Sequence, residues 1–267
     1  DAPTTAARTV SYVVNDGALS SAALTSTLNV TAVNDAPVVN TGTAVSMTTQ
    51  LEDAAVPVDG NTTAGATVAS LLGAVTDVDA ASTLGMAITG IGGNGTLYYS
   101  TNGGTTWSFK LATELTTSNA LLLNGTSRVF YASALNDNGA KTAFWYRGWD
   151  QTNSATVGSL VDVGVSNTAG VNGGTTAYSA ALGTVGITIT AVNDVPVLAT
   201  TSTLAYTENA AATAINAALT VSDVDNTTLA SATVKISSGY VAGQDVLSFA
   251  NDGSTMGNIA GVLSGDT

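Results

Sequence analysis

The chain contains no cysteine and no histidine. The lack of cysteine excludes thiolate metal sites and cysteine nucleophiles, but it says little about the redox compartment because disulfides are only one way to stabilise an exported domain. The lack of histidine removes the commonest general base and the commonest transition-metal ligand. Hydrolysis by a Ser-His-Asp triad and zinc chemistry therefore lack their usual residues here.

Basic residues are also scarce. Six Lys and Arg stand against 19 Asp and Glu, which gives a formal net charge of −13. A nucleic acid would be repelled by this charge, so we expect no nucleic-acid partner. Because most carboxylates have no Lys or Arg to pair with, solvent or metal ions must compensate them. Cations are therefore the expected partners.

Long apolar runs are missing as well. No stretch approaches the ~18 consecutive apolar residues that a membrane helix requires, so we expect no membrane insertion in this segment. The sequence begins Asp1-Ala2-Pro3-Thr4, without a basic region followed by an apolar one. We expect any export signal or anchor to lie outside these 267 residues.

The residues that are present favour β-structure. Hydrophobic residues make up 45% of the chain and charged residues only 9%, which leaves enough apolar material for a core. β-Branched residues recur in short alternating runs that Gly and Asn separate. The composition predicts an all-β protein with one large or two to three small domains.

An internal repeat organises the chain. Residues 30–38, Val-Thr-Ala-Val-Asn-Asp-Ala-Pro-Val, return at 189–197 with changes only at the first and seventh positions. Two further features follow each copy in the same order, an acidic residue and then an Asp-X-Asp element: Glu52 and residues 77–79 in the first, Glu208 and residues 223–225 in the second. This recurrence indicates two related domains.

Each Asn-Asp-X-Pro motif is expected to mark a domain boundary. Pro37 and Pro196 cannot donate to a sheet ladder and restrict the preceding residue to extended conformations, so they indicate a stiff crossing into the next domain. We expect three parts: residues 1–35 as the C-terminal part of one repeat, 36–194 as a complete repeat, and 195–267 as the N-terminal part of a further repeat.

The complete domain shows many short runs of strand-forming residues with turn signals between them. Strands are predicted at residues 96–100, 105–110, 120–123, 127–132, 142–149, 158–165 and 182–192. Asn102-Gly103-Gly104 is a hairpin signal because these residues tolerate positive φ. Many short strands at regular spacing predict a Greek-key β-sandwich of the immunoglobulin type.

The two end pieces each look incomplete. Residues 8–14 and 24–33 offer one hairpin, which is marginal in water on its own. Residues 195–267 offer the first strands of a similar domain without a closing hairpin. Two explanations stay open: the segment belongs to a longer tandem array, or the tail of one subunit is completed by the head of the next, which would give an extracellular filament or sheath joined by strand addition.

Together these motifs resemble the cadherin-like repeats of large bacterial surface adhesins. The matching residues are the junction motifs at 33–37 and 192–196, the two Asp-X-Asp elements, the segment 99–107, and Asn15-Asp16-Gly17 and Gly148-Trp149-Asp150 before the final strands. The resemblance implies tandem immunoglobulin-like domains with Ca²⁺ bound at the junctions, on a cell-surface or secreted protein. The junctions here carry fewer acids than is usual in that family.

The expected strand directions assign ligands to each junction. The first strand of a domain runs away from its N-terminal junction and the second returns, so the Asp-X-Asp loop comes back to that junction together with the loop before the last strand. Calcium takes about six to eight oxygen ligands. The first junction is predicted to use Asn34, Asp35, Asp77, Asp79 and Asp150, and the second Glu52, Asn193, Asp194, Asp223 and Asp225. Asp16 is assigned to a junction upstream, and Glu208 to one downstream.

Two simpler interpretations compete. Asp and Asn are favoured in turns because their side chains bond nearby backbone groups, so each acid taken alone is explained by its turn. The recurring set favours calcium, since two Asp-X-Asp loops would otherwise concentrate repulsion beside a linker. Trp107, Trp145 and Trp149 could form a carbohydrate-binding face, but strand alternation directs some of the aromatic residues at 144–149 into the core.

The sequence therefore predicts a non-catalytic extender of a bacterial adhesin, extracellular and either on the cell surface or secreted. Calcium would stiffen the junctions and hold the domains in line to project an adhesive tip, as in cell adhesion or biofilm formation. The expected partners are adjacent repeats of the same protein or neighbouring copies, with surface glycans under the carbohydrate-binding alternative. No acid pair gathered in an apolar cleft suggests a hydrolase.

Overall fold

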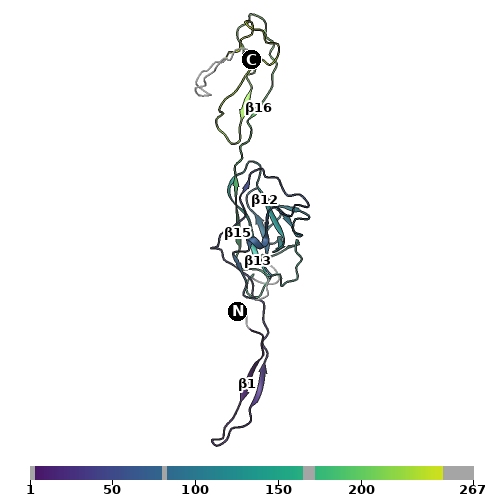
Figure 1. The fold of residues 1–267 in the computed structure, drawn as a ribbon, viewed down its shortest axis with the longest axis vertical. Helices are drawn as coiled ribbons and strands as arrows, with labels where there is room; N and C mark the ends of the chain where they lie inside the picture. The colour runs from purple at the N-terminus through teal and green to yellow at the C-terminus, as the bar shows by residue number, and fades with distance from the viewer. Residues whose placement is uncertain (1–3, 80–82, 165–171, 249–267) are drawn as a thin grey trace. The chain divides into compact units, whose positions relative to one another are not determined.

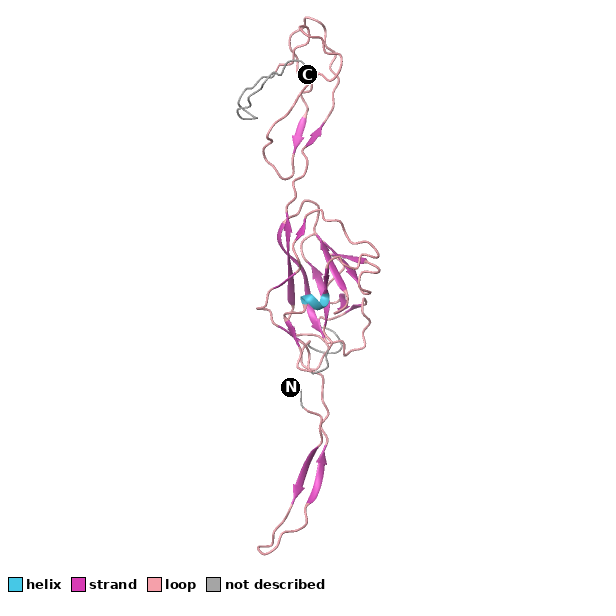
Figure 2. Ribbon diagram, in the orientation of Figure 1, coloured by secondary structure: helices cyan, strands magenta, loops and turns pink. Residues whose placement is uncertain are grey.

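The computed structural model describes residues 4–79, 83–164 and 172–248. Strands make up almost all of its regular structure, and the one helix in this described part is a short 3-10 helix, η1 (Val68–Leu71) (Figure 2). The predicted all-β class is confirmed. No helix of the described residues is long and apolar enough to cross a membrane.

The chain divides into two compact units, residues 1–193 and 194–267. This division falls one residue before the boundary predicted at 194, directly ahead of the second Asp-X-Pro. The boundary predicted at residue 35 separates no units, because residues 1–35 are grouped with the central domain in unit 1.

Two large sheets and a small one build the central domain of unit 1 (Figure 1). The seven-stranded sheet has the order β14-β11-β8-β13-β15-β4, with β5 also paired to β15, and the four-stranded sheet has the order β10-β9-β12-β6. The seven strands are β4 (Val45–Ser46), β5 (Gln50–Leu51), β8 (Gly85–Ile91), β11 (Ala120–Asn124), β13 (Gly139–Trp149), β14 (Leu160–Val161) and β15 (Gly183–Thr190). The four are β6 (Ala66–Thr67), β9 (Thr96–Ser100), β10 (Ser108–Leu111) and β12 (Arg128–Ala132), and the small sheet pairs β3 (Val38–Val39) with β7 (Val75–Thr76).

The strands predicted in this domain are found close to their expected positions, but no range was predicted for the strands before residue 96, which are the short β3 to β7 and the longer β8. β9 has the predicted bounds, whereas the strand predicted at 158–165 is reduced to β14, and its last residue lies outside the described residues. The sequence did not predict β8, which lies between β11 and β13. Six of its seven residues are buried, so the strand shows no alternation of apolar and polar positions.

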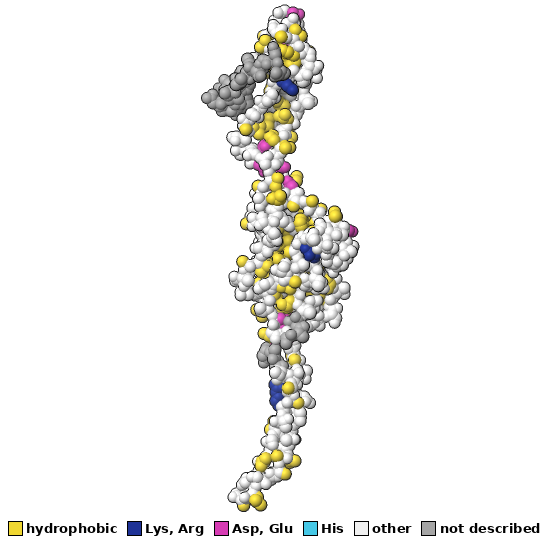
Figure 3. Space-filling model, viewed as in Figure 1, with side chains coloured by type: hydrophobic (Ala, Val, Ile, Leu, Met, Phe, Trp, Pro, Cys, Tyr) yellow, Lys and Arg dark blue, Asp and Glu magenta, His cyan; other side chains and the backbone are white. Residues whose placement is uncertain are grey.

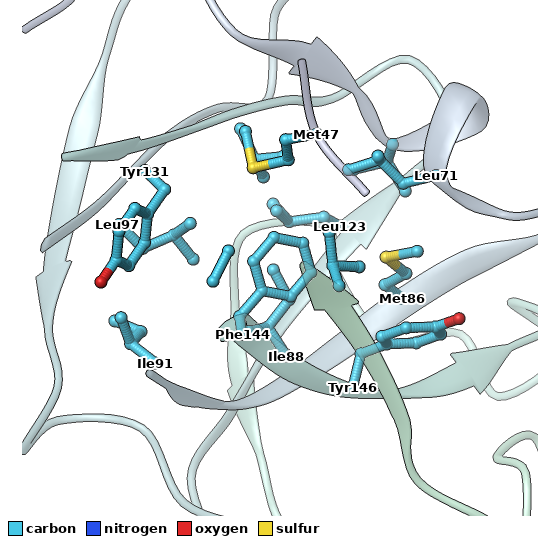
Figure 4. Close-up of a cluster of buried hydrophobic side chains, with 14 of the residues drawn as sticks. Met47, Leu71, Met86, Ile88, Ile91, Leu97, Leu123, Tyr131, Phe144 and Tyr146 are labelled. Atoms are coloured by element: carbon cyan, nitrogen blue, oxygen red, sulfur yellow. The ribbon is translucent and has the colours of Figure 1, made fainter. Parts of the chain in front are cut away.

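The main hydrophobic core lies between the two large sheets (Figure 4). Strand alternation places Leu97 and Tyr131 of the four-stranded sheet opposite Met86, Ile88 and Phe144 of the seven-stranded sheet, and all five are fully buried. The same periodicity that suggested strands in the sequence thus decides which side chains fill the sandwich.

A second, smaller core covers the other face of the seven-stranded sheet. The long connection between β13 and β15 folds over this face and brings Val163 and Tyr178 against Leu122 and Trp149. Trp149 is only 1% exposed, and its indole N–H donates to Asn153 Oδ1 at 3.0 Å. Both faces of β8 are therefore covered, which is the physical reason for its continuous burial.

Arg147 fastens this connection to the sheet. Its guanidinium donates to the carbonyl oxygens of Val163, Ser179 and Ala180 at 3.0, 2.9 and 2.6 Å, and the side chain is only 6% exposed. Burial lowers the pKa of Arg147, since desolvation disfavours the charged form. The hydrogen bonds to three backbone carbonyls offset part of that cost.

The N-terminal hairpin of unit 1 is a single layer. β1 (Arg8–Tyr12) pairs with β2 (Leu24–Leu28) in antiparallel register, and every residue of both strands is exposed. Apolar side chains such as Tyr12, at 55% exposed, and Leu24, at 74%, lie on these strands. A two-stranded ribbon of this kind has no core of its own.

Unit 2 is similarly open in its described residues. β16 (Val197–Ala199) pairs with β17 (Thr220–Ser222), and all six residues are exposed. Apolar side chains are visible over the surface of this unit, whereas charged side chains are sparse (Figure 3). Apolar side chains of this unit, such as Leu198 at 69% exposed, are open to solvent.

The role of Arg147 can be tested by replacing it with Met, which keeps the apolar stem and removes the donors. We expect the free energy of unfolding to fall by about 3 kcal/mol, because two buried carbonyls and one partly buried carbonyl lose a charged partner. Tryptophan fluorescence during urea unfolding measures this, since all three tryptophans lie in unit 1. Arg128→Met is the matched control: Arg128 also binds three carbonyl oxygens but is half-exposed, so a loss of about 1 kcal/mol or less is expected. Equal losses would contradict the anchoring role.

Candidate calcium-binding linkers

The first linker, residues 33–37, lies beside the Asp-X-Asp loop, residues 77–79, because of how β3 and β7 pair. The two strands are antiparallel, with Val38 opposite Thr76 and Val39 opposite Val75. The chain therefore leaves the linker along β3 and returns to it along β7, which ends just before Asp77. The loop returns to the linker as expected, although the returning strand is β7 and not the second strand of the domain.

One hydrogen bond joins the loop to the linker, and a second lies within the loop. The backbone N–H of Asp35 donates to Asp79 Oδ2 at 2.8 Å, and the backbone N–H of Asp79 donates to Asp77 Oδ1 at 2.8 Å. The second bond closes a turn in which an Asp side chain binds the backbone two residues on. The first bond ties the carboxylate of a distant residue to the linker itself.

Asp150 approaches the same linker from the end of β13. Its Oδ2 accepts the side-chain N–H of Asn34 at 2.9 Å, and its Oδ1 accepts the N–H and hydroxyl of Thr152 at 2.9 and 2.7 Å. Asp150 is 2% exposed. Asn34 also donates to the carbonyl oxygen of Thr176 at 3.3 Å, and carbonyl oxygens are suitable calcium ligands. All five residues predicted for this junction thus lie around the linker.

Gly148 allows the linker to pack this closely. A Cβ at this position would lie 2.9 Å from a methyl carbon of Val75 and 3.4 Å from the ring of Pro37. The glycine in Gly148-Trp149-Asp150 therefore lets β13 contact both the linker and β7. A side chain here would require Val75 or Pro37 to shift.

Unit 2 repeats this arrangement with its own residues. Val197 lies opposite Ser222, and these two occupy the positions of Val38 and Thr76 in the first copy. The backbone N–H of Asp194 donates to Asp225 Oδ2 at 2.5 Å, and that of Asp225 donates to Asp223 Oδ1 at 3.0 Å. The register and both hydrogen bonds are the same in the two copies, although the chain between the paired strands is shorter in the second.

Glu52 lies at the other end of the central domain. β4 and β5 run parallel to β15, with Gln50 opposite Ile189, so both chains reach the same end of the sheet. There Glu52 Oε1 accepts the backbone N–H of Val192 at 2.7 Å. The acid is therefore beside the chain that leads to Asn193, as the sequence suggested.

Asn138 was not identified from the sequence. Its side-chain N–H donates to Glu52 Oε2 at 3.1 Å, from the loop that precedes β13. The run Asn136-Asp137-Asn138 was a signal that could have been used, since it concentrates oxygen-bearing side chains in one turn. It lacks the Asp-X-Asp pattern, and for this reason it was overlooked.

The remaining predicted residues are Asp16, Glu208 and Asn193. Asp16 Oδ1 accepts the backbone N–H groups of Ala18 and Leu19 at 2.9 and 2.8 Å, and these bonds lower the pKa of Asp16, with Leu19 contributing most. This is the ordinary role of Asp in a turn. Glu208 and Asn193 are exposed.

The carboxylates at the first linker accept hydrogen bonds from amide groups of the linker and of their own loops. Within the described residues of unit 1, no three acidic side chains place an oxygen within 4.8 Å of one another. A bound calcium ion would have to draw these oxygens inwards to about 2.4 Å from its centre.

The three tryptophans do not form one face. Trp149 lies in the second core and cannot stack on a sugar, which corrects its place in the carbohydrate-binding alternative. Trp145 is 38% exposed on the seven-stranded sheet. Trp107 precedes β10 of the four-stranded sheet and donates its indole N–H to the carbonyl of Asn61 at 3.1 Å.

No family model, curated protein or solved structure matches the chain. The function must therefore be argued from the contacts themselves.

Replacing Glu52 with Ala tests whether this acid holds the second linker. The N–H of Val192 would lose its acceptor, and we expect hydrogen exchange at residues 191–193 to accelerate by roughly fivefold, which corresponds to about 1 kcal/mol for a single bond. Glu52→Gln keeps one oxygen for Val192 and is expected to change exchange much less. Unchanged exchange in Glu52→Ala would show that the linker is held by other groups.

The turn at Asp16 should respond to acid. Because the pKa of Asp16 is lowered in the folded hairpin, its contribution is present at neutral pH and is lost as the pH falls through that lowered pKa. NMR amide shifts of Ala18 and Leu19 should follow this titration and should stay flat in Asp16→Asn. An Asp16 pKa at or above that of an unstructured Asp would contradict the turn assignment.

Proposed function

We propose that the chain is a non-catalytic, calcium-stiffened extender made of immunoglobulin- or cadherin-like β-sandwich repeats. One observation carries this proposal: the same linker-to-loop contact, from Asp35 to Asp79 and from Asp194 to Asp225, occurs in both copies with the same strand register. Turn formation alone needs only the bond within each Asp-X-Asp loop. The added bond to the linker is what a device for fixing a junction requires.

The path of the chain through the central domain suits an extender. β13 and β15 are antiparallel, so the end of β13 lies beside the start of β15. Asp150 follows β13 and contacts the first linker at this end. Glu52 contacts Val192 just after the other end of β15. β15 has eight residues and therefore spans roughly 27 Å. The chain thus enters and leaves this domain at opposite ends, so successive domains would add length.

Calcium would act by changing the balance of charge at the linkers. The acids at each linker repel one another, and the net charge of −13 leaves few bases to compensate them. A divalent cation bound by oxygens of both linker and loops would remove this repulsion and restrict rotation about the linker. Stiffness would then depend on the calcium concentration around the protein.

The acids of the described residues do not line either of the two hollows found in unit 1. Two shallow hollows in unit 1, one near Thr83 and Gln151 and the other near Thr43 and Thr184, are lined mainly by small, apolar and amide side chains, with Tyr146 as the one titratable residue. Burial raises the pKa of Tyr146, so it stays a neutral phenol. The acids lie instead at turns and linkers.

This role places the protein outside the cell, on a bacterial surface or secreted, where millimolar calcium is present and extracellular modules bind it with a Kd of about 10⁻⁴ to 10⁻³ M. Its partners would be the adjacent repeats of the same adhesin. The resemblance of the junction motifs to cadherin-like repeats is the support for this setting.

Thermal unfolding and small-angle scattering with calcium and with a chelator test the proposal. At a calcium concentration 100-fold above Kd, the folded state gains about 2.7 kcal/mol, which raises Tm by about 5–10 °C for a domain of this size. The maximum dimension should also increase. Asp77→Ala with Asp79→Ala should remove the effect of the first junction.

The control removes the same charge elsewhere. Asp162 and Asp245 accept the backbone N–H groups of Gly164 and Val241, and neither is assigned to a linker, so Asp162→Ala with Asp245→Ala should keep the calcium response. Magnesium in place of calcium should have a smaller effect, because Mg²⁺ demands a tighter octahedral site. If calcium changes neither Tm nor length, the acids are turn residues only.

A second candidate function follows from the exposed apolar side chains of the N-terminal hairpin and of unit 2. Val10 and Leu28 of the hairpin are 45% and 59% exposed, and Val197 and Leu198 of unit 2 are 57% and 69% exposed. We propose that a sheet of the same type covers each of them, supplied by adjacent repeats or by a neighbouring copy. Mixing the chain with its own residues 1–35 as a peptide tests this: protection of β16 amides would favour joining between copies, and no protection would favour a continuous array.

A further inference from the structure

β10 is a free edge at the solvent-exposed end of a row of aromatic side chains. Within the described residues, β10 pairs with β9 and has no neighbour on its other side. Phe109 on β10, Tyr98 on β9 and Phe130 on β12 lie opposite one another in register, which places them in one row across the sheet. The ring centres of Tyr98 lie 5.7 Å from Phe109 and 6.4 Å from Phe130.

This row lies on the face of the sheet turned away from the core. Leu97 and Tyr131, the neighbours of Tyr98 and Phe130 along their strands, are fully buried in the main core, so alternation turns the row outwards. Phe109 is 55% exposed, and Leu111, two residues further along the same face, is 47% exposed, whereas Phe130 at the far end of the row is only 8% exposed. The rings are tilted by 41° and 78° to one another, which is unsuitable for a flat sugar-stacking platform.

Two acidic side chains accept hydrogen bonds from backbone N–H groups along this edge. The N–H just before the strand, on Trp107, donates to Asp59 Oδ1 at 2.8 Å, and the N–H of Leu111 donates to Glu114 Oε2 at 2.7 Å. Successive N–H groups of a strand point to opposite sides, so the N–H groups of Trp107, Phe109 and Leu111 share one side. The acids therefore bracket the edge on the side away from β9.

Glu114 is well suited to this position. Its other oxygen accepts the ammonium of Lys110 at 3.1 Å, and the N–H of Leu111, followed by Lys110, lowers the pKa of Glu114. The carboxylate is thus charged at neutral pH and held in place from two sides. Natural proteins use charged groups at edge strands in this way to prevent pairing with other chains.

We propose that β10 is a strand-pairing surface that Asp59 and Glu114 hold closed, and that the partner it fits is β10 of a second copy of this chain. An antiparallel pair of β10 strands centred near Phe109 would be self-complementary, as a two-fold interface requires. It would continue the aromatic row of one copy into the row of the other. Cross-strand aromatic pairs are among the more favourable contacts in a sheet.

The size of the surface sets the strength of this contact. A stable protein interface buries about 1,200–2,000 Å² in total, and an edge of four residues with two or three apolar side chains offers well under that. Pairing is therefore weak and matters only where copies are crowded. In the wild-type chain, Asp59 and Glu114 occupy the backbone N–H groups of Trp107 and Leu111 and so prevent this pairing even where copies are crowded.

Sedimentation equilibrium of Asp59→Ala with Glu114→Ala tests the proposal, at protein concentrations from about 10 to 500 µM. We expect the weight-average mass to rise above that of the wild type and to approach twice its value at the upper end. Adding Phe109→Lys should return the mass to the wild-type value, because a charge would then face its own copy across the pair. Amide exchange should show new protection at β10 in the associated state.

The control removes equal charge from acids that accept backbone N–H groups in other loops. Asp16→Ala with Asp162→Ala reduces the net charge by the same amount and should leave the mass unchanged. Folding is monitored by tryptophan emission. If the double variant fails to fold, Asp59→Ala is used alone, since the turn at Glu114 then stays intact. A folded variant with the wild-type mass, or association that survives Phe109→Lys, overturns the proposal.

Discussion

The hydrogen bond from a linker amide to the second carboxylate of an Asp-X-Asp loop is the contact on which the account depends. It joins residues that are distant in sequence, Asp35 with Asp79 and Asp194 with Asp225, and it depends on the antiparallel pairing of β3 with β7 and of β16 with β17. The register of those strands decides which carboxylate meets the linker. A slip of one residue would turn the loop to the other face and remove the contact.

The rest of the central domain keeps that contact in place. Gly148 lets β13 lie against Pro37 and β7, and Asp150 then meets Asn34. Arg147, two residues before Trp149, ties down the long connection whose carbonyl oxygens border the same linker. At the other end of β15, Glu52 accepts the backbone N–H of Val192 in the chain that leaves the domain. Core packing, the linker and the candidate ligands are thus parts of one continuous set of contacts.

Much of this arrangement was predictable from the sequence because the repeat fixes two reference points. Conserving the order of Asn-Asp-X-Pro and Asp-X-Asp within one chain indicated that the loop returns to the linker, and alternation predicted the strands that border the core. β8 was missed because both of its faces are covered, one by a connection whose path no periodicity reveals. Asn138 was missed for a similar reason, since its meeting with Glu52 depends on tertiary pairing and not on spacing. The guarded edge at β10 likewise required the positions of Asp59 and Glu114, which lie on different sides of the strand in sequence.

The most direct test of the account is an NMR titration of the side-chain carboxyl carbons with Ca²⁺. If calcium binds at the linkers, the carboxyl signals of Asp79 and Asp225 should shift together with the backbone amides of Asp35 and Asp194, and the signal of Asp59 should stay unchanged. Saturation should occur in the millimolar range or below. Shifts that are spread evenly over all acids, without saturation, would show only general screening and would contradict the junction sites.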